Sequence, residues 1–469
     1  MTGIATDAPL SLYNTLTRRT EPLVPGEPGH VRMYLCGVTV YDRAHVGHAR
    51  TWVVFDALAR FLEWRGFRVT YVRNVTDIDD RIIERSAQQG ISAAELGDVM
   101  TRAMMEDSTA LGCRAPDVEP RATAHIEEMI ALIAKLEEKG LAYRSEGDVY
   151  FDVAAFPPYG KLSHRRIDDL RAGARVEVGE QKRHPEDFAL WKGVKPGEPF
   201  WESPFGPGRP GWHIECSAMS TRYLGQPFDL HGGGEDLIFP HHENELAQSE
   251  GAVGDTFASH WMHISFLRID EEKMSKSLGN FFTTREVLAK IRHPEVLRFF
   301  LLSSHYRGPM NYSPEQLEQA EAGLNRLYTA LRDLPAVPLL KGSAATHSFN
   351  EAMDDDFNTP EAIAVLQGLA RELNAARGVA SAVTLGETAA ELKSLGGVLG
   401  ILQVPSEQWF RGKSAGGLSD TQIDGQIAAR LAARKAKNWA ESDRIRNELA
   451  EAGVILEDKP GGTTSWRRA

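Results

Sequence analysis

The sequence predicts an α/β protein in which a parallel sheet precedes a bundle of helices and a small mixed module. Two short apolar runs, at 31–35 and 67–72, flank a stretch over 47–65 in which apolar residues recur at helical spacing. Such a strand–helix–strand unit is the building block of a parallel sheet and indicates a Rossmann-like domain. Beyond residue 313, successive segments show helical spacing, which indicates the bundle.

The first predicted unit has clear ends. The run at 31–35 reads Val-Arg-Met-Tyr-Leu, and Cys36 with the following glycine ends the strand. Trp52 and Phe55 belong to the apolar face of the next helix, and Gly66 is a typical stop signal after it. The carboxyl end of the strand and the amino end of the helix therefore lie together, where open α/β sheets bind nucleotides.

The rest of the chain divides into segments of different texture. Between Arg121 and Glu202, a helical stretch at 124–139 and a strand-like stretch at 148–153 are punctuated by prolines, which indicates an insertion into the sheet domain. Residues 405–419 have the composition of a linker. We expect the first half of the sheet domain at 1–120, an inserted domain at 121–204, the second half at 205–260, a linking domain at 261–312, the bundle at 313–403 and a C-terminal α/β module at 404–469.

Composition restricts the class of protein. The formal net charge is -12, which argues against a generally basic nucleic-acid-binding protein. The chain has three cysteines and shows neither a secretory signal nor a membrane-spanning run, so a disulfide framework is not expected. We therefore expect a cytoplasmic protein that does not associate with membranes.

A histidine tetrad, His45-Val46-Gly47-His48, stands where the first strand gives way to the first helix. The amino end of a helix favours anions, and a neutral imidazole can donate one hydrogen bond to a phosphate oxygen. His45 and His48 are therefore candidate catalytic residues, and Gly47 is a candidate for close approach of a nucleotide. Taken alone, the tetrad could equally be two surface histidines near a turn.

A lysine pentad, Lys273-Met274-Ser275-Lys276-Ser277, follows more than two hundred residues later, after an acidic run. Its small residues around paired lysines indicate a loop that can close over a ligand, and lysine is a compact cation suited to a charge that moves during a reaction. A solvated charged loop is the alternative. Tetrad and pentad in this order predict that ATP phosphates are held from two sides, with Lys273 and Lys276 contributing charge.

Cysteine, histidine and glutamate residues indicate a metal site. Cys36 ends the first strand, Cys216 lies in a later motif, and His241 and Glu245 are spaced to share one helix face. Two thiolates, one imidazole and one carboxylate suit zinc better than magnesium.

Other residues compete for these metal-ligand roles. His213 or His242 could be a ligand instead, and a single cysteine is more often a buried apolar residue. Cys113 lacks comparable neighbours, so we interpret it as structural.

In combination, several motifs closely resemble the cysteinyl-tRNA synthetases, a family of class I aminoacyl-tRNA synthetases. The resemblance covers nearly the whole chain. It rests on the tetrad, the pentad and four further stretches at 36–42, 74–80, 212–216 and 239–245. It implies one zinc ion held by Cys36, Cys216, His241 and Glu245, which binds the thiolate of the substrate cysteine. Serine has a hard hydroxyl that coordinates poorly, so the metal would select sulfur over oxygen.

The resemblance also implies a two-step reaction. The carboxylate of L-cysteine attacks the α-phosphorus of Mg²⁺-bound ATP, and the adenylate then passes to the terminal adenosine of tRNA(Cys). His45, His48 and Lys276 would stabilise the transition state, whereas Thr76, Trp212 and Asp236 match positions that line the amino-acid and adenylate pocket. The inserted domain and the bundle would contact tRNA, and a monomer is expected.

The C-terminal module adds a candidate surface for the anticodon. Arg430, Arg434, Lys435 and Lys437 cluster on one predicted helix beside Trp439. Local basic groups must make the contacts to RNA in so acidic a chain, and a tryptophan can stack on an unpaired base. A solvated basic helix face is the alternative reading.

Three other functions fit parts of the pattern. A cysteine ligase with an amino-sugar acceptor, as in mycothiol synthesis, would share the ATP and zinc chemistry but would need no basic C-terminal module. A simpler nucleotidyltransferase would have the tetrad without the pentad and the metal ligands. A non-catalytic tRNA-binding or zinc-structural protein would not activate cysteine.

Overall fold

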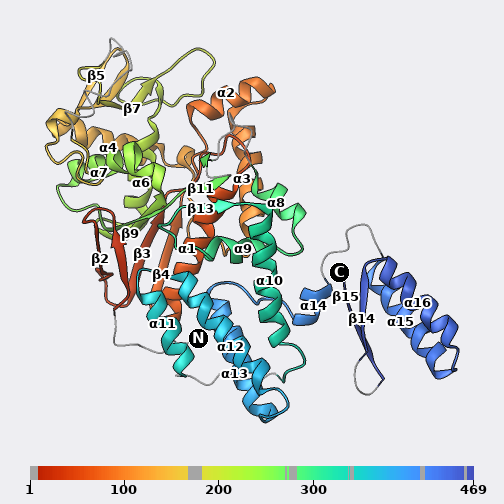
Figure 1. The fold of residues 1–469 in the computed structure, drawn as a ribbon. Helices are drawn as coiled ribbons and strands as arrows, with labels where there is room; N and C mark the ends of the chain where they lie inside the picture. Colours follow the sequence, from red (N-terminus) through yellow and green to blue (C-terminus); the bar gives the residue numbers. More distant parts are fainter. Residues whose placement is uncertain are drawn as a thin grey trace.

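The computed structural model describes residues 9–166, 182–269, 272–273, 282–335, 337–338, 343–411, 418–458 and 462–468. Its centre is a parallel sheet with strand order β10-β9-β3-β4 (Figure 1). The sheet and its first connecting helix consist of β3 (His30–Leu35), α1 (Val46–Trp64), β4 (Arg68–Arg73), β9 (Phe228–Gly234) and β10 (Ala258–Ile264). The predicted strand–helix–strand unit is confirmed, with bounds that differ by one residue.

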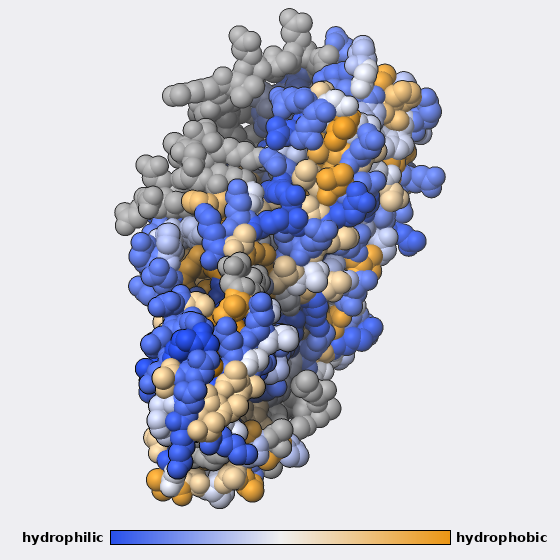
Figure 2. Space-filling view, turned by 90° about the vertical axis from the view of Figure 1, so that its right-hand side faces the viewer, coloured by the Kyte–Doolittle hydropathy of each residue, from blue (hydrophilic) through white to orange (hydrophobic). Residues whose placement is uncertain are grey.

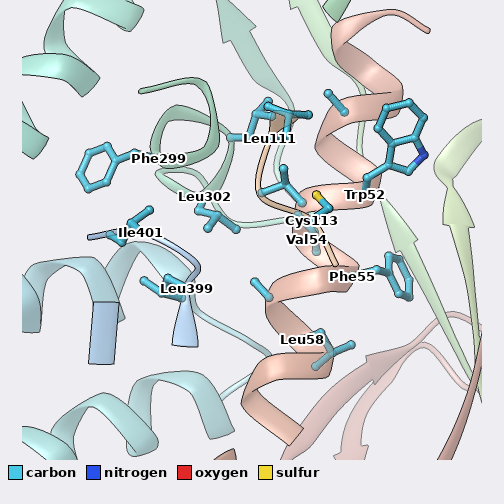
Figure 3. Packing of buried hydrophobic residues seen from close by; sticks show 14 of the residues in the cluster. Trp52, Val54, Phe55, Leu58, Leu111, Cys113, Phe299, Leu302, Leu399 and Ile401 are labelled. Atoms are coloured by element: carbon cyan, nitrogen blue, oxygen red, sulfur yellow. The ribbon is translucent and has the colours of Figure 1, made fainter. Parts of the chain in front are cut away.

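Helix α1 occupies the centre of the largest hydrophobic cluster. Figure 3 shows Trp52, Val54 and Phe55 of α1 beside Leu111, Cys113 and residues of later segments. The helix is covered on nearly all sides, so it is apolar almost all around and not amphipathic. Gly66, with φ of +91°, adopts the left-handed conformation just after α1, as its stop signal predicts.

The inserted segment forms its own antiparallel sheet in the order β5-β6-β7-β8. It comprises α4 (Ile126–Glu138), β5 (Ala142–Ser145), β6 (Asp148–Phe151), β7 (Phe188–Gly193) and β8 (Gly208–Pro210). The predicted strand at 148–153 ends early, because a 3₁₀ turn begins at Val153. Helix α4 packs on α6 and α7, so the insertion shares a core with the second half of the sheet domain.

The sequence analysis did not predict several connecting elements. Between β4 and the insertion lie two helices and a 3₁₀ turn, and an N-terminal hairpin borders β10 (Figure 1). These are α2 (Asp80–Gln89), α3 (Ala93–Ala110), η1 (Ala122–Ala124), β1 (Ser11–Asn14) and β2 (Arg19–Pro22).

The second half of the sheet domain leads into a linking segment. Helix α6 (Trp212–Leu224) precedes β9, and α7 (Glu243–Val253) precedes β10. A three-stranded sheet in the order β12-β11-β13 follows, built from β11 (Leu267–Ile269), β12 (Glu272–Lys273) and β13 (Met310–Tyr312). Helices α8 (Thr284–Lys290) and α9 (Pro294–Leu302) lie between β12 and β13 in the chain.

The predicted helical bundle is confirmed. It contains α10 (Pro314–Ala330), α11 (Ala344–Asp354), α12 (Thr359–Ala376) and α13 (Ala382–Val398). Ser313 caps α10 by accepting a hydrogen bond from Gln316 N, whereas α12 is capped by Asn358. The stretch expected to be a linker contains a short helix, α14 (Ser406–Arg411), because Trp409 and Phe410 bury their side chains against the bundle.

The C-terminal module lies beyond α14 (Figure 1). It consists of α15 (Asp420–Lys435), α16 (Trp439–Glu451) and the antiparallel pair β14 (Val454–Asp458) and β15 (Thr464–Arg468). Part of the predicted basic face is internal. Arg430 is buried and, like Arg434, pairs with Asp458, whereas Trp439 is 59% exposed. Trp439 is therefore an accessible member of the predicted RNA surface, as are Lys435 and Lys437.

The surface of the molecule is predominantly polar where Figure 2 displays it, with hydrophobic residues in small groups. Within the described part of the chain, no helix combines the length and the apolar character needed to cross a membrane.

Candidate active site and metal centre

The candidate site lies at the carboxyl ends of β3 and β9, where the chain connections reverse their direction along the central sheet. From β3 the chain proceeds through α1 to β4 on one side, whereas β9 lies on the other side of β3 and is followed by β10. Cys36 N donates to Gly232 O at 2.8 Å, which joins the carboxyl ends of β3 and β9. Ligands of open α/β sheets bind at such a topological switch point.

The four predicted metal ligands meet at this edge. Cys36 Sγ lies 3.6 Å from Cys216 Sγ and 3.3 Å from His241 Nε2, and His241 Nε2 lies 3.0 Å from Glu245 Oε1. All four side chains are buried, and their potential ligand atoms lie within 4.8 Å of one another. The structure therefore brings together residues that are more than two hundred positions apart in the sequence.

Each of the four residues lies in a different local structure. Cys36 directly follows β3, Cys216 lies in α6, and Glu245 lies in the first turn of α7. His241 precedes α7 in an irregular turn, in which Phe239 has a non-helical backbone. The expected i, i+4 relation of His241 and Glu245 therefore holds although the helix proper begins only at residue 243.

Burial and charge set the protonation of the cluster in the metal-free protein. Burial opposes the imidazolium, but the Glu245 carboxylate and the nearby Cys216 thiol raise the pKa of His241 to about 10. Burial likewise opposes ionisation of Glu245, whose pKa nevertheless falls to about 2 beside His231 and His241. Burial raises the pKa of the Cys216 thiol well above its usual range. The cluster thus holds protons that a metal cation would displace.

Further histidines surround the cluster. His213 Nδ1 lies 2.9 Å from His241 Nδ1, and His231 Nε2 lies 2.8 Å from Glu245 Oε2. His242 Nδ1 lies 2.8 Å from His263 Nε2. Burial lowers the pKa of His213 and of His242 well below the usual range, so both are neutral at neutral pH.

These contacts separate the alternatives left open for the metal ligands. His213 contacts His241 at Nδ1, on the side of the ring away from the other ligands, and does not belong to the four-residue cluster. His242 belongs, with His231 and Glu245, to a second group whose atoms could share one ion. The sequence analysis did not single out His231 or His263. Their spacing carries no signal of this role, because β9 and β10 are buried along nearly their whole length.

The three predicted pocket residues lie around this cluster. Trp212 packs against His241 with ring centroids 4.2 Å apart and planes tilted by 30°, and the Thr76 hydroxyl donates to Glu215 Oε2 at 2.8 Å. Burial raises the pKa of Glu215 well above its usual range, although Thr76 donates to it. Asp236 is exposed on the turn after β9. Glu215 is a polar neighbour of this pocket that the sequence analysis did not assign.

Both tetrad histidines take part in the cap of α1. His48 N donates to His45 Nδ1 and His45 N donates to His48 Nδ1, each at 3.3 Å, and the rings stack at 3.7 Å. Because both Nδ1 atoms accept hydrogen bonds, the ring proton of each neutral imidazole is on Nε2. The fold therefore selects the tautomer that can donate from Nε2 at the amino end of a helix.

The lysine pentad is only partly covered by the structure. Lys273 ends β12, and its backbone pairs with Arg268 of β11. Lys276 lies outside the described residues, so its predicted role rests on the sequence.

Comparison with known proteins identifies the chain. Residues 22–322 match the family model of the class I (C) tRNA synthetase catalytic domain, 348–403 match a DALR domain, and 420–467 match a cysteinyl-tRNA ligase anticodon-binding domain. The cysteine--tRNA ligase of Methylococcus capsulatus is 60% identical over 468 residues, which are 98% of this chain and 100% of that protein. That of Thioalkalivibrio sulfidiphilus is 60% identical over 464 residues, again 98% and 100%.

Solved structures agree in fold. Methionyl-tRNA synthetase of Mycobacterium tuberculosis, in complex with methionyl-adenylate, superposes with a TM-score of 0.57 at 17% identity, over 79% of this chain and 89% of that chain. Leucyl-tRNA synthetase of Agrobacterium radiobacter K84, in a ternary complex with tRNA, gives 0.60 at 12% identity, over 80% and 85%. Sheet, switch-point site and family model together define a class I aminoacyl-tRNA synthetase.

At 60% identity over nearly the full length, the chain belongs to the cysteine--tRNA ligase family. It is accordingly an ATP-dependent ligase that joins cysteine to tRNA(Cys). The amino-sugar-acceptor alternative is not supported, because the match extends through the anticodon-binding module at 420–467. The family assignment also removes the two remaining alternatives, a simpler nucleotidyltransferase and a non-catalytic protein.

Proposed function

We propose that Cys36, Cys216, His241 and Glu245 hold one Zn²⁺ ion that selects the thiol of the substrate cysteine. The observation that carries this proposal is the convergence of these four buried side chains at the switch point of the sheet. When bound, the ion would supply a soft Lewis-acid centre for a sulfur ligand, which a serine hydroxyl matches poorly.

The interatomic distances fit a zinc ion. Tetrahedral zinc with Zn–S bonds of ~2.3 Å and Zn–N bonds of ~2.05 Å separates two sulfurs by about 3.8 Å and a sulfur from a nitrogen by about 3.5 Å. The corresponding separations are 3.6 Å for Cys36 and Cys216 and 3.3 Å for Cys36 and His241. Small outward movements of the side chains would admit the ion.

The hydrogen-bond partners of Glu245 and His241 also fit a metal site. Glu245 Oε1 is buried and lacks a hydrogen bond of good geometry among the described residues, while Oε2 is held by His231. His241 is held at Nδ1 by His213, which leaves Nε2 directed at the other ligands. Metal-binding histidines are usually oriented in this way by a group at the second nitrogen.

The chain's own residues then position the amino acid. Trp212, packed against His241, would cover the metal side of the pocket and exclude water. Thr76 is fixed by Glu215, so its oxygen is held at one place on the pocket wall. Asp236 lies exposed on the turn after β9, where it would interact with the adenylate.

Activation of the carboxylate uses the two ATP motifs. His45 and His48 would donate from Nε2 to phosphate oxygens of Mg²⁺-bound ATP, and Lys273 and Lys276 would approach the pyrophosphate from the other side. Gly47, between the histidines, has no side chain to block the nucleotide. These groups stabilise developing charge and form no covalent intermediate with the substrate.

Transfer requires the remaining domains. The inserted domain and the bundle would contact the acceptor arm of tRNA(Cys), and the C-terminal module would contact its anticodon, with Trp439 available for stacking. We further infer that one chain suffices for these contacts, so a monomer is the expected active form.

The test is cysteine-dependent ATP–pyrophosphate exchange measured together with zinc content. Cys216→Ser is expected to lose both, whereas Cys113→Ser, at a buried cysteine outside the cluster, is expected to keep about one zinc per chain. A Cys216→Ser protein with wild-type zinc content and wild-type exchange would refute the proposal.

A further inference from the structure

Arg50 lies on α1 two residues after His48 and is 1% exposed. Among the described residues, its guanidinium donates to backbone carbonyls alone. Nη1 contacts Ser265 O at 2.8 Å and Phe266 O at 3.3 Å, and Nη2 contacts His305 O at 3.0 Å and Gly308 O at 2.8 Å. The tetrad helix is therefore joined by one side chain to two loops that are distant in sequence.

These two loops lead into neighbouring strands. Ser265 and Phe266 precede β11, and His305 and Gly308 precede β13, which pairs with β11 in parallel from Leu267 and Met310 onward. On its other edge β11 pairs with β12, which ends at Lys273, the first residue of the pentad. Arg50 thus binds the loops that lead into β11 and β13, and β11 pairs in turn with β12, the strand that ends at the first residue of the pentad.

The far end of the pentad segment is attached to the tetrad as well. His45 and Thr283 form an antiparallel bridge, Val46 N donates to Phe282 O at 3.2 Å, and Thr284 N donates to Ala44 O at 2.9 Å. The chain is consequently tied to the tetrad region both before and after the pentad. In the first tie, one side chain, that of Arg50, makes the hydrogen bonds and apolar packing between α1 and β11 adds to them, whereas the second tie consists of backbone hydrogen bonds.

Burial of the Arg50 guanidinium costs free energy. No carboxylate of the described residues lies within ion-pair distance of Arg50, and its Nε lacks a partner there. Burial lowers the pKa of Arg50 to about 10, so the group still carries its charge at neutral pH. The Glu235 carboxylate acts on Arg50 only from beyond ion-pair distance, so hydrogen bonds must offset most of the free energy that burial of this cation costs. Only a guanidinium has enough N–H groups for four carbonyls in two directions.

Arg298 of α9 provides a contrast within the same cluster. It is also fully buried, but it pairs with the Asp56 carboxylate and donates to Leu399 O and Leu111 O. Its contacts join α1 to the bundle and not to β11 or β13. A purely structural arginine at a domain junction is therefore available as a matched comparison.

We propose that Arg50 is a positioning residue for amino-acid activation, because it fixes β11 and the strand leading into the lysine pentad relative to His45 and His48. The inference rests on the proposed function, in which tetrad and pentad act on the same ATP. A misplacement of ~1 Å between such groups can lower a rate about 100-fold. Arg50 touches no substrate atom in this scheme, and it acts through the lysines.

A double-mutant cycle in the full-length enzyme tests the proposal. Arg50→Lys is expected to lower kcat of ATP–pyrophosphate exchange by about 100-fold, with KM for cysteine within about twofold of wild type. In a Lys276→Ala background, the same substitution should lower kcat by less than about threefold, because its effect passes through the pentad. Arg298→Lys should lower the melting temperature but leave kcat within about threefold, in both backgrounds.

The outcomes separate the inference from the proposed function. An Arg50→Lys enzyme that folds, binds zinc and keeps kcat, or an effect that multiplies in the double mutant, overturns the inference alone. A Lys276→Ala enzyme with unchanged kcat overturns the proposed roles of the pentad and the inference together. Arg50→Gln, which keeps two N–H donors without the charge, repeats the cycle if the lysine variant does not fold. Failure of both to fold would assign Arg50 to stability and also overturn the inference.

Discussion

His231 offers a sharp prediction about the metal centre. Its Nε2 lies 2.8 Å from Glu245 Oε2, and its ring stacks on Trp261 with centroids 4.4 Å apart and planes 13° from parallel. Both rings are fully buried. His231→Phe keeps an aromatic ring for the stack but removes the hydrogen-bond donor, so it isolates the contact to the proposed metal ligand.

The expected magnitude follows from that contact. A hydrogen bond to a charged group contributes about 1.5–3 kcal/mol, and the Glu245 carboxylate is ionised and completely buried. If the whole contribution appears in metal binding, zinc affinity falls by about 10- to 150-fold. This range agrees with the loss of affinity of about 10- to 100-fold that follows removal of a group hydrogen-bonded to a metal ligand.

Competition with a fluorescent zinc chelator measures the affinity directly, without reference to activity. His231→Gln is the matched control, because its side-chain amide keeps an N–H donor and should recover most of the lost affinity. Unfolding by urea monitors stability in each variant. If His231→Phe binds zinc as tightly as wild type while folding normally, then zinc affinity does not depend on the contact between His231 and Glu245, and this prediction is wrong.

Three further predictions concern protons, close packing and the C-terminal module. The pKa of His241 is raised to about 10 and that of Cys216 is also raised, so zinc binding must displace protons from both side chains. Apparent zinc affinity should therefore rise between pH 6.5 and 8.5, by about tenfold per pH unit for each proton released. A flat pH profile in chelator competition would contradict this prediction. Gly232→Ala should destabilise the sheet domain by several kcal/mol (~3) in urea unfolding, since a Cβ there would lie 1.9 Å from Phe55 Cζ. Gly425→Ala in α15 meets no atom within 4 Å and should stabilise the C-terminal module by about 0.5–1 kcal/mol, observed as slower hydrogen exchange of α15 amides; faster exchange would be inconsistent with helix propensity as the deciding effect.

The sequence predicted the parts of the fold that depend on local periodicity. Helix α1 and its flanking strands followed from the spacing of apolar residues, and so did the series of helices that forms the bundle. The short strands β1, β2, β8 and β13 were missed because three or four residues carry too little alternation to stand out. The helix α14 was missed because two aromatic residues, docked on a distant bundle, override a composition typical of a linker.

The site was predictable to the extent that each residue type has its own chemistry. Cysteine, histidine and glutamate are recognisable as ligands in a sequence, but their supporting residues are not. His213, His231 and His263 are placed by tertiary contacts, and nothing in their spacing distinguishes a histidine that orients a ligand from one that fills a core. The charge pattern was similarly ambiguous for Arg430, which a helix-surface reading assigned to RNA and which pairs with Asp458 in the module's own interior.

The layout of the central sheet explains why metal and nucleotide chemistry can be kept apart yet adjacent. Alternate residues of a strand face opposite sides of the sheet, so the face that carries Tyr34 and Cys36 is turned away from α1, which packs on Met33 and Leu35. The four proposed metal ligands therefore collect on one face, and the tetrad begins the helix on the other. In the proposed function, a substrate that spans the carboxyl edge would offer its sulfur to the first face and its carboxylate to ATP beside the second.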